Sequence, residues 1–248
     1  VYIISFIKPF KIYLTNHNIW SIDKKYKWTG KLLAMIQSRL VKLLYVNENT
    51  PERYKAAGIK MCENSEKISP FLPPNIEDGK NIFEEYSFEI KSFVENKSPL
   101  LIANAHKIVF LEDTDLYGFD MCLASLEVLV SKYPNLGLIF AIGNVDEHSN
   151  YIQEKIERLK SKNLDDSFLL VFPQITIWPL IDEVDILLRP TCTDGSAISI
   201  DEALYLGTKV IASDVTSRQE GSILFKSRDQ NDFENCILKV LNNAPSTN

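Results

Sequence analysis

The feature that most constrains the fold is the alternation of short β-branched runs with amphipathic stretches in the C-terminal half of the chain. Residues 137–142 (GLIFAI) form a short, wholly apolar run, which is typical of a strand buried on both faces of a parallel sheet. The stretch before it places Leu123, Leu126 and Val130 on one helical face. Strands that alternate with such helices build βαβ units. The sequence therefore predicts an α/β fold with a doubly wound parallel sheet.

The same pattern extends through the rest of this half. Strands are expected at 100–104, 107–111, 137–142, 167–172, 185–189, 209–213 and 222–225. Helices are expected at 119–132, 150–162, 197–206 and 230–241. Together these elements amount to a nearly complete doubly wound domain.

The first ninety residues are less regular. Strands are expected at 2–6, 11–15 and 43–47, and helices at 31–40 and 81–95. Pro70, Pro73 and Pro74 interrupt the chain, and Lys97-Ser98-Pro99 interrupts it again. We expect a partial N-terminal α/β domain with its linker at 1–96, and a complete Rossmann-like domain at 97–248.

Composition excludes several classes of protein. With 248 residues, 45% hydrophobic and 24% charged, the chain is neither disordered nor collagen-like. Its net charge of −6 argues against nucleic acid as a partner, because a phosphate backbone requires a basic surface. Four cysteines without CxxC spacing indicate a reducing compartment and exclude a zinc ribbon.

Targeting signals are not recognised either. No apolar run approaches the roughly 18 residues of a membrane helix, and residues 1–7 lack the basic flank and cleavage site of a signal peptide. The expected location is cytoplasmic. The chain begins with Val1 rather than Met, which suggests a piece of something longer.

The segment 187–214 carries the chemistry. A strand ends at Arg189-Pro190, a polar loop runs to Gly195, and a helix begins near Ala197. Open α/β sheets bind ligands where strand ends meet helix starts, and the free N–H groups of a helix terminus suit a phosphate. Gly195 lets a ligand approach the backbone. Ser196 and Ser199 add hydroxyl donors.

Two acids in this segment admit two interpretations. Glu202 lies in the second turn of the helix, where a carboxylate can accept from both hydroxyls of a ribose. Alternatively, Glu202 is a solvated helix residue and Asp194 a helix N-cap. The local pattern leaves both interpretations open.

The wider context favours the first interpretation. Residues 189–195 read RPTCTDG, 202–204 EAL, 207–214 GTKVIASD and 218–225 RQEGSILF. This combination resembles the retaining GT-B glycosyltransferases that carry an E-x7-E motif (glycosyltransferase family 4-like, group 1). Weaker similarity touches Asp115–Asp120 as a first βα loop and Thr15-Asn16-His17 as a strand end of the acceptor domain.

The resemblance implies a GT-B-like fold and a set of site residues. Asp194 and His17 would face the donor sugar as catalytic residues. The diphosphate would lie along Gly195–Ile198, Glu202 would hold the ribose, and Phe172 would lie near the nucleobase. The expected donor-binding residues are Gly195, Ser196, Ala197, Ile198, Ser199, Glu202, Arg189 and Phe172.

The activity implied is transfer of a sugar, with retention of configuration, from a UDP- or GDP-sugar to a glycan or lipid-linked acceptor. Surface polysaccharide biosynthesis is the expected setting. No prosthetic group and no metal are expected. His17, His106 and His148 are far apart in the sequence, which also argues against a metal site. Peripheral association with the inner face of the membrane and the oligomeric state stay open.

Three departures from the family pattern stand out. The family usually has an Arg and a Lys in the first loop of the second domain, where this chain has Asn104-Ala105-His106 and Tyr117-Gly118. Arg189, Lys107 or Arg218 would therefore have to supply the positive charge that neutralises the departing diphosphate. The first acid is Asp rather than Glu, and the chain is short for two domains. The alternative function is therefore a catalytically impaired or truncated nucleotide-sugar-binding module or partner subunit. A GT-B epimerase of UDP-sugars fits the loop less well.

Overall fold

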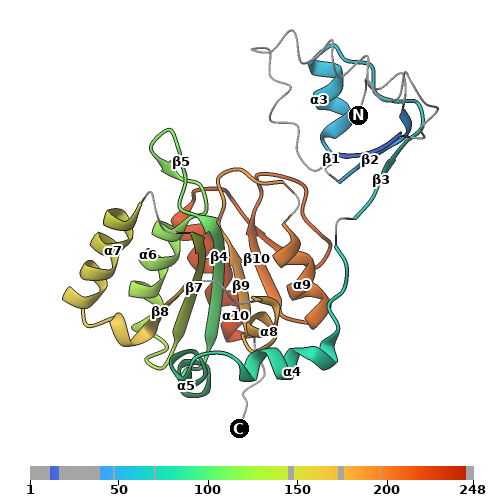
Figure 1. Ribbon diagram of the computed structural model, residues 1–248. Helices are drawn as coiled ribbons and strands as arrows, with labels where there is room; N and C mark the ends of the chain where they lie inside the picture. Colours follow the sequence, from blue (N-terminus) through green and yellow to red (C-terminus); the bar gives the residue numbers. More distant parts are fainter. Residues whose placement is uncertain are drawn as a thin grey trace. The chain divides into compact units, whose positions relative to one another are not determined.

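The computed structural model describes residues 12–16, 40–46, 48–69, 71–144, 148–172, 176–195 and 197–243. The chain divides into two compact units, Val1–Phe71 and Leu72–Asn248 (Figure 1). Each unit has its own sheet.

In the described part of the first unit, three parallel strands pair in the order β1-β2-β3. These elements are β1 (Ile12–Asn16), β2 (Leu40–Tyr45), α3 (Thr50–Ala56) and β3 (Ser65–Lys67). A small core joins Leu43 of β2 to Tyr54 of α3 and to Ile59. The strands expected at 11–15 and 43–47 correspond to β1 and β2. The expected strand 2–6 and nearly all of the expected helix 31–40 lie outside the described residues.

The second unit is built on a parallel sheet with the strand order β11-β10-β9-β4-β7-β8. Its strands are β4 (Leu100–Lys107), β7 (Gly137–Asn144), β8 (Phe168–Val171), β9 (Ile186–Arg189), β10 (Lys209–Ser213) and β11 (Ile223–Phe225). In chain order this is the doubly wound arrangement 3-2-1-4-5-6, whose direction of winding reverses between β4 and β9. Ligands of open α/β sheets bind outside the carboxyl ends of the strands at that point.

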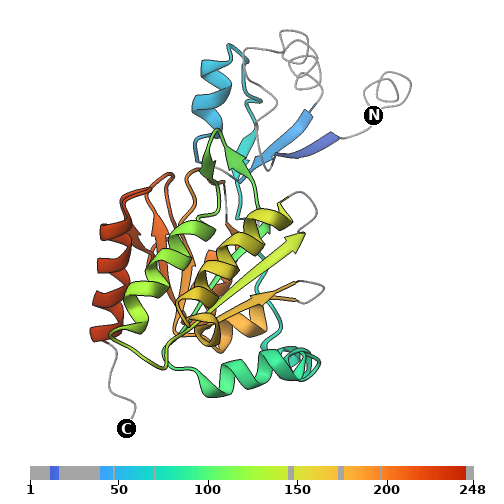
Figure 2. The same cartoon turned by 90° about the vertical axis from the view of Figure 1, so that its left-hand side faces the viewer.

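Helices cover both faces of the sheet, as Figures 1 and 2 show. One face carries the helices α6 (Phe119–Val130), α7 (Ser149–Ser161) and α10 (Gln230–Asn242). The other carries α4 (Ile76–Glu84), α5 (Phe88–Asn96), α8 (Trp178–Asp182) and α9 (Ile198–Leu206).

Strand β7 shows why its sequence is apolar throughout. Leu138, Phe140 and Ile142 belong to the core under α6 and α7, whereas Ile139 and Ala141 belong to the core of the opposite face. Successive side chains of a strand point to opposite faces, so burial on both faces removes the alternation of polar and apolar residues. The predicted α/β fold with a parallel sheet is confirmed.

Two expectations differ in detail from the structure. The expected strands 100–104 and 107–111 become one long strand, β4, and a short antiparallel hairpin of β5 (Phe110–Leu111) with β6 (Thr114–Asp115). The expected helix 81–95 is two helices, α4 and α5. The chain breaks between them because Ser87 caps α5, accepting a hydrogen bond from Ile90 N at 3.3 Å.

The division between the units falls before α4 and α5, whereas the sequence predicts a boundary after them, at the end of 1–96. These helices join the second unit through their packing. Tyr86 and Ile90 are buried in the core on one face of the six-stranded sheet. Gly79 of α4 lies so close to the Trp178 ring of α8 that a Cβ on Gly79 would come within 2.6 Å of the ring. A charged sequence of this kind does not reveal which sheet its few apolar residues cover.

In the described part of the chain, every helix is too short or too polar to cross a lipid bilayer.

Candidate functional site

The carboxyl ends of β4 and β9 meet at the point where the winding of the sheet reverses. Arg189, the last residue of β9, donates from Nη1 to the carbonyl oxygen of Asn104 in β4 at 3.3 Å. Its guanidinium carbon also lies 5.3 Å from the centroid of the Tyr117 ring. The Arg189 side chain therefore lies against the end of the neighbouring strand and the loop that follows it.

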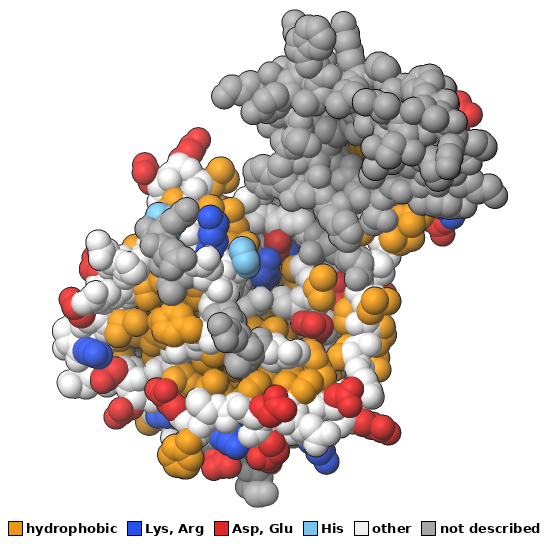
Figure 3. Space-filling model, in the orientation of Figure 1, with side chains coloured by type: hydrophobic (Ala, Val, Ile, Leu, Met, Phe, Trp, Pro, Cys, Tyr) orange, Lys and Arg blue, Asp and Glu red, His pale blue; other side chains and the backbone are white. Residues whose placement is uncertain are grey.

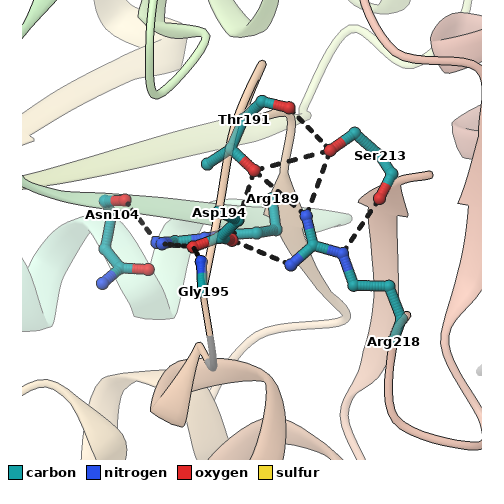
Figure 4. A network of polar contacts seen from close by, with 7 residues as sticks. All are labelled: Asn104, Arg189, Thr191, Asp194, Gly195, Ser213 and Arg218. Carbon is teal, nitrogen blue, oxygen red and sulfur yellow. Dashed lines mark hydrogen bonds and ion pairs between the residues drawn. The ribbon is translucent and has the colours of Figure 1, made fainter. Parts of the chain in front are cut away.

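Asp194 occupies the centre of this region (Figure 4). Its carboxylate accepts from Arg189 Nε at 2.9 Å and Nη2 at 3.1 Å, and from Arg218 Nη1 at 2.8 Å. Thr191 Oγ1 donates to it at 3.2 Å and the backbone N–H of Gly195 at 2.9 Å. Both carboxylate oxygens are thus already engaged within the protein.

The charge state of Asp194 follows from these partners. Burial raises the pKa of its carboxyl, but the guanidiniums of Arg189 and Arg218 outweigh burial, and the pKa lies below its ordinary value. Asp194 is therefore ionised at neutral pH.

Arg218 ties the ends of two strands together. Its Nε donates to Ser213 O at 2.9 Å, and its Nη2 donates to Thr191 Oγ1 at 3.0 Å and to Ser213 Oγ at 3.1 Å. Ser213 Oγ in turn donates to Thr191 O at 2.6 Å. The sequence names Arg218 only as a residue that could replace the positive charge of the family's usual Arg and Lys. The motif at 218–225 is the only signal for Arg218, and it does not predict the contacts with Asp194, Thr191 and Ser213.

No side chain of the described residues caps the N-terminus of α9. Ala197 is its N-cap residue and cannot supply a side-chain cap, so the first N–H groups of the helix lack the usual side-chain partner. A Cβ built on Gly195 meets no atom within 4 Å. Ile198 is half-exposed and Ser199 is buried, while Ser196 lies outside the described residues. Among the described residues, the start of α9 therefore has backbone N–H donors without a side-chain partner and open space beside Gly195.

Glu202 lies one turn further along α9 and is half-buried. Burial and the neighbouring Asp201 raise the pKa of its carboxyl. It makes no hydrogen bond or ion pair with any described residue, and Asn104 Oδ1 is likewise a buried acceptor without a hydrogen-bond donor in the described part of the chain. Both acceptors are available to hydroxyl groups of a ligand.

The N-terminus of α6, at the same edge of the sheet, differs. The Asp115 carboxylate accepts from the backbone N–H groups of Tyr117 at 3.0 Å, Gly118 at 3.1 Å and Asp120 at 3.4 Å. Tyr151 donates its hydroxyl to the same carboxylate at 3.2 Å. Burial and the charge of Asp120 raise the pKa of Asp115 above its ordinary value. This helix start is closed by the protein's own carboxylate.

Two expected site residues are not found in this group. Phe172 follows the edge strand β8, and β7 and β4 stand between β8 and β9. Its exposed ring lines a hollow of about 550 Å³ with Ile152, Ile156, Phe168 and Leu170, on the face shown in Figure 3. His17 lies outside the described residues. Of the predicted set, the structure joins Arg189, Asp194 and Gly195 by hydrogen bonds. The first turns of α9, which begins two residues after Gly195, carry the N-cap residue Ala197 and then Ile198, Ser199 and Glu202.

Within the described ranges, no group of three or more histidine, cysteine, aspartate or glutamate side chains is arranged to hold a metal ion.

Comparison with known proteins identifies the family. Residues 106–243 match the family of group 1 glycosyl transferases. The match covers more than half of the chain, and the chain belongs to this family. Among curated proteins, none matches it significantly.

Solved structures show the same GT-B fold at low sequence identity. Anabaena HepE (Alr3699) in complex with UDP and glucose shares 13% identity at a TM-score of 0.69, over 98% of this chain and 65% of that one. A glycosyltransferase from Rickettsia africae shares 13% at 0.73, over 97% and 63%. An α,α-trehalose-phosphate synthase (UDP-forming) from Burkholderia vietnamiensis shares 8% at 0.71, over 95% and 59%. The chain thus spans less than two thirds of the length of these structures.

Proposed function

We propose that this chain provides the nucleotide-sugar-binding part of a glycosyltransferase. The observation that carries the proposal is the pairing of an uncapped helix start at α9 with Glu202, a half-buried carboxylate that has no hydrogen-bond or ion-pair partner among the described residues. Family membership and the UDP complexes of HepE support the same ligand class.

The donor's parts correspond to different groups of the chain. The diphosphate accepts hydrogen bonds from the free N–H groups at the start of α9, whose helix dipole favours an anion. Gly195 leaves room for it, and the hydroxyl of Ser199 or Ser196 adds a donor. Glu202 accepts from the ribose hydroxyls, and Asn104 Oδ1 from a hydroxyl of the sugar.

In the proposed reaction, an acceptor hydroxyl attacks the anomeric carbon of the donor sugar as the bond to the diphosphate breaks. Retention of configuration follows if attack and departure occur on the same face, where the departing phosphate oxygen can take the proton of the acceptor. Positive charge and N–H groups near the diphosphate stabilise the charge that develops on it. A glycan or lipid-linked acceptor in surface polysaccharide biosynthesis, in the cytoplasm or at the inner face of the membrane, completes the proposal.

The test measures binding and transfer separately. A UDP- or GDP-sugar should raise the melting temperature, and Glu202→Ala should remove most of that shift by weakening the affinity about tenfold or more, because a charge-assisted hydrogen bond contributes about 1.5–3 kcal/mol. Glu154→Ala, which removes an exposed acid from α7, is the matched control and should leave the shift unchanged. No shift with any nucleotide sugar would contradict the proposal.

A second candidate is a nucleotide-sugar-binding module or partner subunit that does not catalyse transfer. It is favoured by the full engagement of the Asp194 carboxylate within the protein. Donor hydrolysis and transfer assays on the full-length protein separate the two candidates. Donor binding without turnover supports the second.

A further inference from the structure

Two buried guanidiniums share one carboxylate at the end of β9. The Arg189, Arg218 and Asp194 side chains are 10%, 2% and 9% exposed. Both arginines form their ion pair with Asp194, and in the described part of the chain neither guanidinium has a second acidic partner within ion-pair distance. The cluster therefore carries a net charge of +1 in a place that water barely reaches.

An unbalanced charge in such a place is costly, because the protein interior replaces water poorly as a solvent for ions. A bound anion would balance it. Arg189 retains donors for one. A guanidinium has about five N–H groups, and Arg189 uses three in its bonds to Asp194 and Asn104 O. Arg218 is more fully engaged, with bonds to Asp194, Thr191 and Ser213.

The cluster adjoins the open helix start. The Asp194 carboxylate that holds both arginines also accepts the backbone N–H of Gly195 at 2.9 Å, two residues before the N-cap of α9 (Figure 4). The excess positive charge and the uncapped N–H groups are therefore fixed to one loop.

We propose that Arg189 and Arg218, held on the shared carboxylate of Asp194, form the cationic seat for a diphosphate. Arg189 contacts the anion. Arg218 and Asp194 are positioning residues that fix Arg189 and the Gly195 loop, and Asp194 is not a ligand of the donor sugar. The identity of the anion as part of a nucleotide sugar rests on the proposed function, whereas the seat itself requires a diphosphate group alone.

The first experiment uses inorganic pyrophosphate as the probe, at constant ionic strength set with sodium chloride. Pyrophosphate should raise the melting temperature of the wild-type chain. Arg189→Gln makes the cluster neutral but keeps the Asp194–Arg218 pair, and it should weaken pyrophosphate binding about tenfold, the loss expected for one charge-assisted contact. Arg189→Lys retains the charge and should restore most of the affinity.

The matched control is Arg158→Gln. It also removes one positive charge, but Arg158 lies in the last turn of α7, where it forms an exposed ion pair with Glu127 of α6. A helix that follows a parallel strand ends at the opposite edge of the sheet, so Arg158 is far from the proposed diphosphate site. It should bind pyrophosphate as the wild type does. A wild type without a shift, or an Arg189→Gln variant with the wild-type shift, would overturn the proposal.

The second experiment separates positioning from sugar contact. Asp194→Asn raises the charge of the cluster and releases both arginines but removes no contact with the donor sugar, so it should lower the melting temperature and change the affinities for pyrophosphate, UDP and UDP-glucose by one common factor. A loss confined to UDP-glucose would show a sugar ligand, and a loss of stability with all three affinities unchanged would show a merely structural role; either result overturns the assignment. If Asp194→Asn does not fold, the Arg189→Gln and Arg189→Lys pair decides the question.

The two proposals fail differently. If nucleotide sugars do not bind but pyrophosphate binds in an Arg189-dependent way, the proposed function fails and the seat remains. If UDP-glucose binds in a Glu202-dependent way and Arg189→Gln changes nothing, the seat fails and the proposed function remains.

Discussion

Two helix starts lie at the carboxyl edge of the same sheet, and the protein treats them in opposite ways. At α6, the Asp115 carboxylate accepts three backbone N–H groups and the Tyr151 hydroxyl. At α9, the N-cap is Ala197, and none of the described side chains caps the helix. A closed start satisfies its own donors, whereas an open one leaves them to a ligand.

The carboxylates of the two loops, Asp115 and Asp194, also differ in the direction of their pKa shifts. Burial and the charge of Asp120 raise the pKa of Asp115, although the N–H groups that it accepts act in the opposite direction. Asp194 lies between two guanidiniums, and its pKa is lowered. The first loop uses its acid to stabilise the fold. The second uses its acid to hold cations beside an open helix start, which is an arrangement suited to a phosphate.

The largest expected effect concerns the glycine of the closed loop. Gly118 has a φ of +69°, and a Cβ there would lie 2.5 Å from Pro190 O. Gly118→Ala therefore combines left-handed backbone strain with a clash against backbone, and it should lower the free energy of unfolding by about 3 kcal/mol. Urea unfolding measures the loss.

The control for this variant is Gly207→Ala. Gly207 has a φ of +86°, but a Cβ there meets no atom within 4 Å, so this change costs strain alone, about 1 kcal/mol. Equal losses for the two variants would mean that the contact between the α6 loop and Pro190 contributes nothing.

The next effect is smaller and tests the cap itself. Asp115→Ala removes the acceptor of three N–H groups and should lower the free energy of unfolding by about 2 kcal/mol. Asp115→Asn keeps one acceptor oxygen and should cost less. Affinity for UDP-glucose, measured by calorimetry, should be unchanged in Asp115→Asn. A loss as large as that of Glu202→Ala would place the ligand at α6 and reverse the comparison.

The open loop predicts the reverse pattern at its own glycine. Gly195→Ala should leave the free energy of unfolding within about 0.5 kcal/mol of the wild type, because a Cβ there meets no atom within 4 Å. UDP-glucose affinity should fall about tenfold, since the methyl group takes space that the diphosphate needs. Calorimetry and urea unfolding on the same preparation provide both values. An unchanged affinity would mean that the ligand does not approach this loop.

The predicted parallel sheet is confirmed, because it depends on local signals, whereas the position of the site stays a prediction drawn from equally local signals. The run at 137–142 is apolar since it is buried on both faces, and the strand, loop and helix around Gly195 follow one another directly. Glu202 was interpreted either as a ribose ligand or as a solvated residue. Its carboxylate is half-buried and has no partner in the described part of the chain, and the ribose-ligand interpretation stays a prediction.

The use of Asp194 could not be predicted in this way. The sequence offered a sugar ligand or a helix cap, whereas the structure shows a carboxylate shared by Arg189, five residues before it, and Arg218, twenty-four residues after it. The second contact depends on the parallel pairing of β9 with β10, which brings Ser213 and its following loop beside Thr191. Parallel strands are joined by long crossover connections, so the pattern of one segment does not show which loops its strand brings together.

The smallest expected effect is in the pH dependence of stability, and it has opposite signs in the two loops. Because the folded-state pKa of Asp194 is lowered, its ionisation contributes stability that is complete above the unfolded-state pKa and is lost as the pH falls through the folded-state pKa. The folded-state pKa of Asp115 is raised, so its contribution is greatest below the unfolded-state pKa and is lost as the pH rises through the folded-state pKa.

Urea unfolding of the wild type, Asp115→Asn and Asp194→Asn from about pH 7 to about pH 3 measures the contributions of both carboxylates to stability. On acidification the stability advantage of the wild type should shrink against Asp194→Asn and grow against Asp115→Asn. Slopes of the same sign would show that the two carboxylates share one electrostatic environment, and the contrast between a closed and an open helix start would then lose its physical basis.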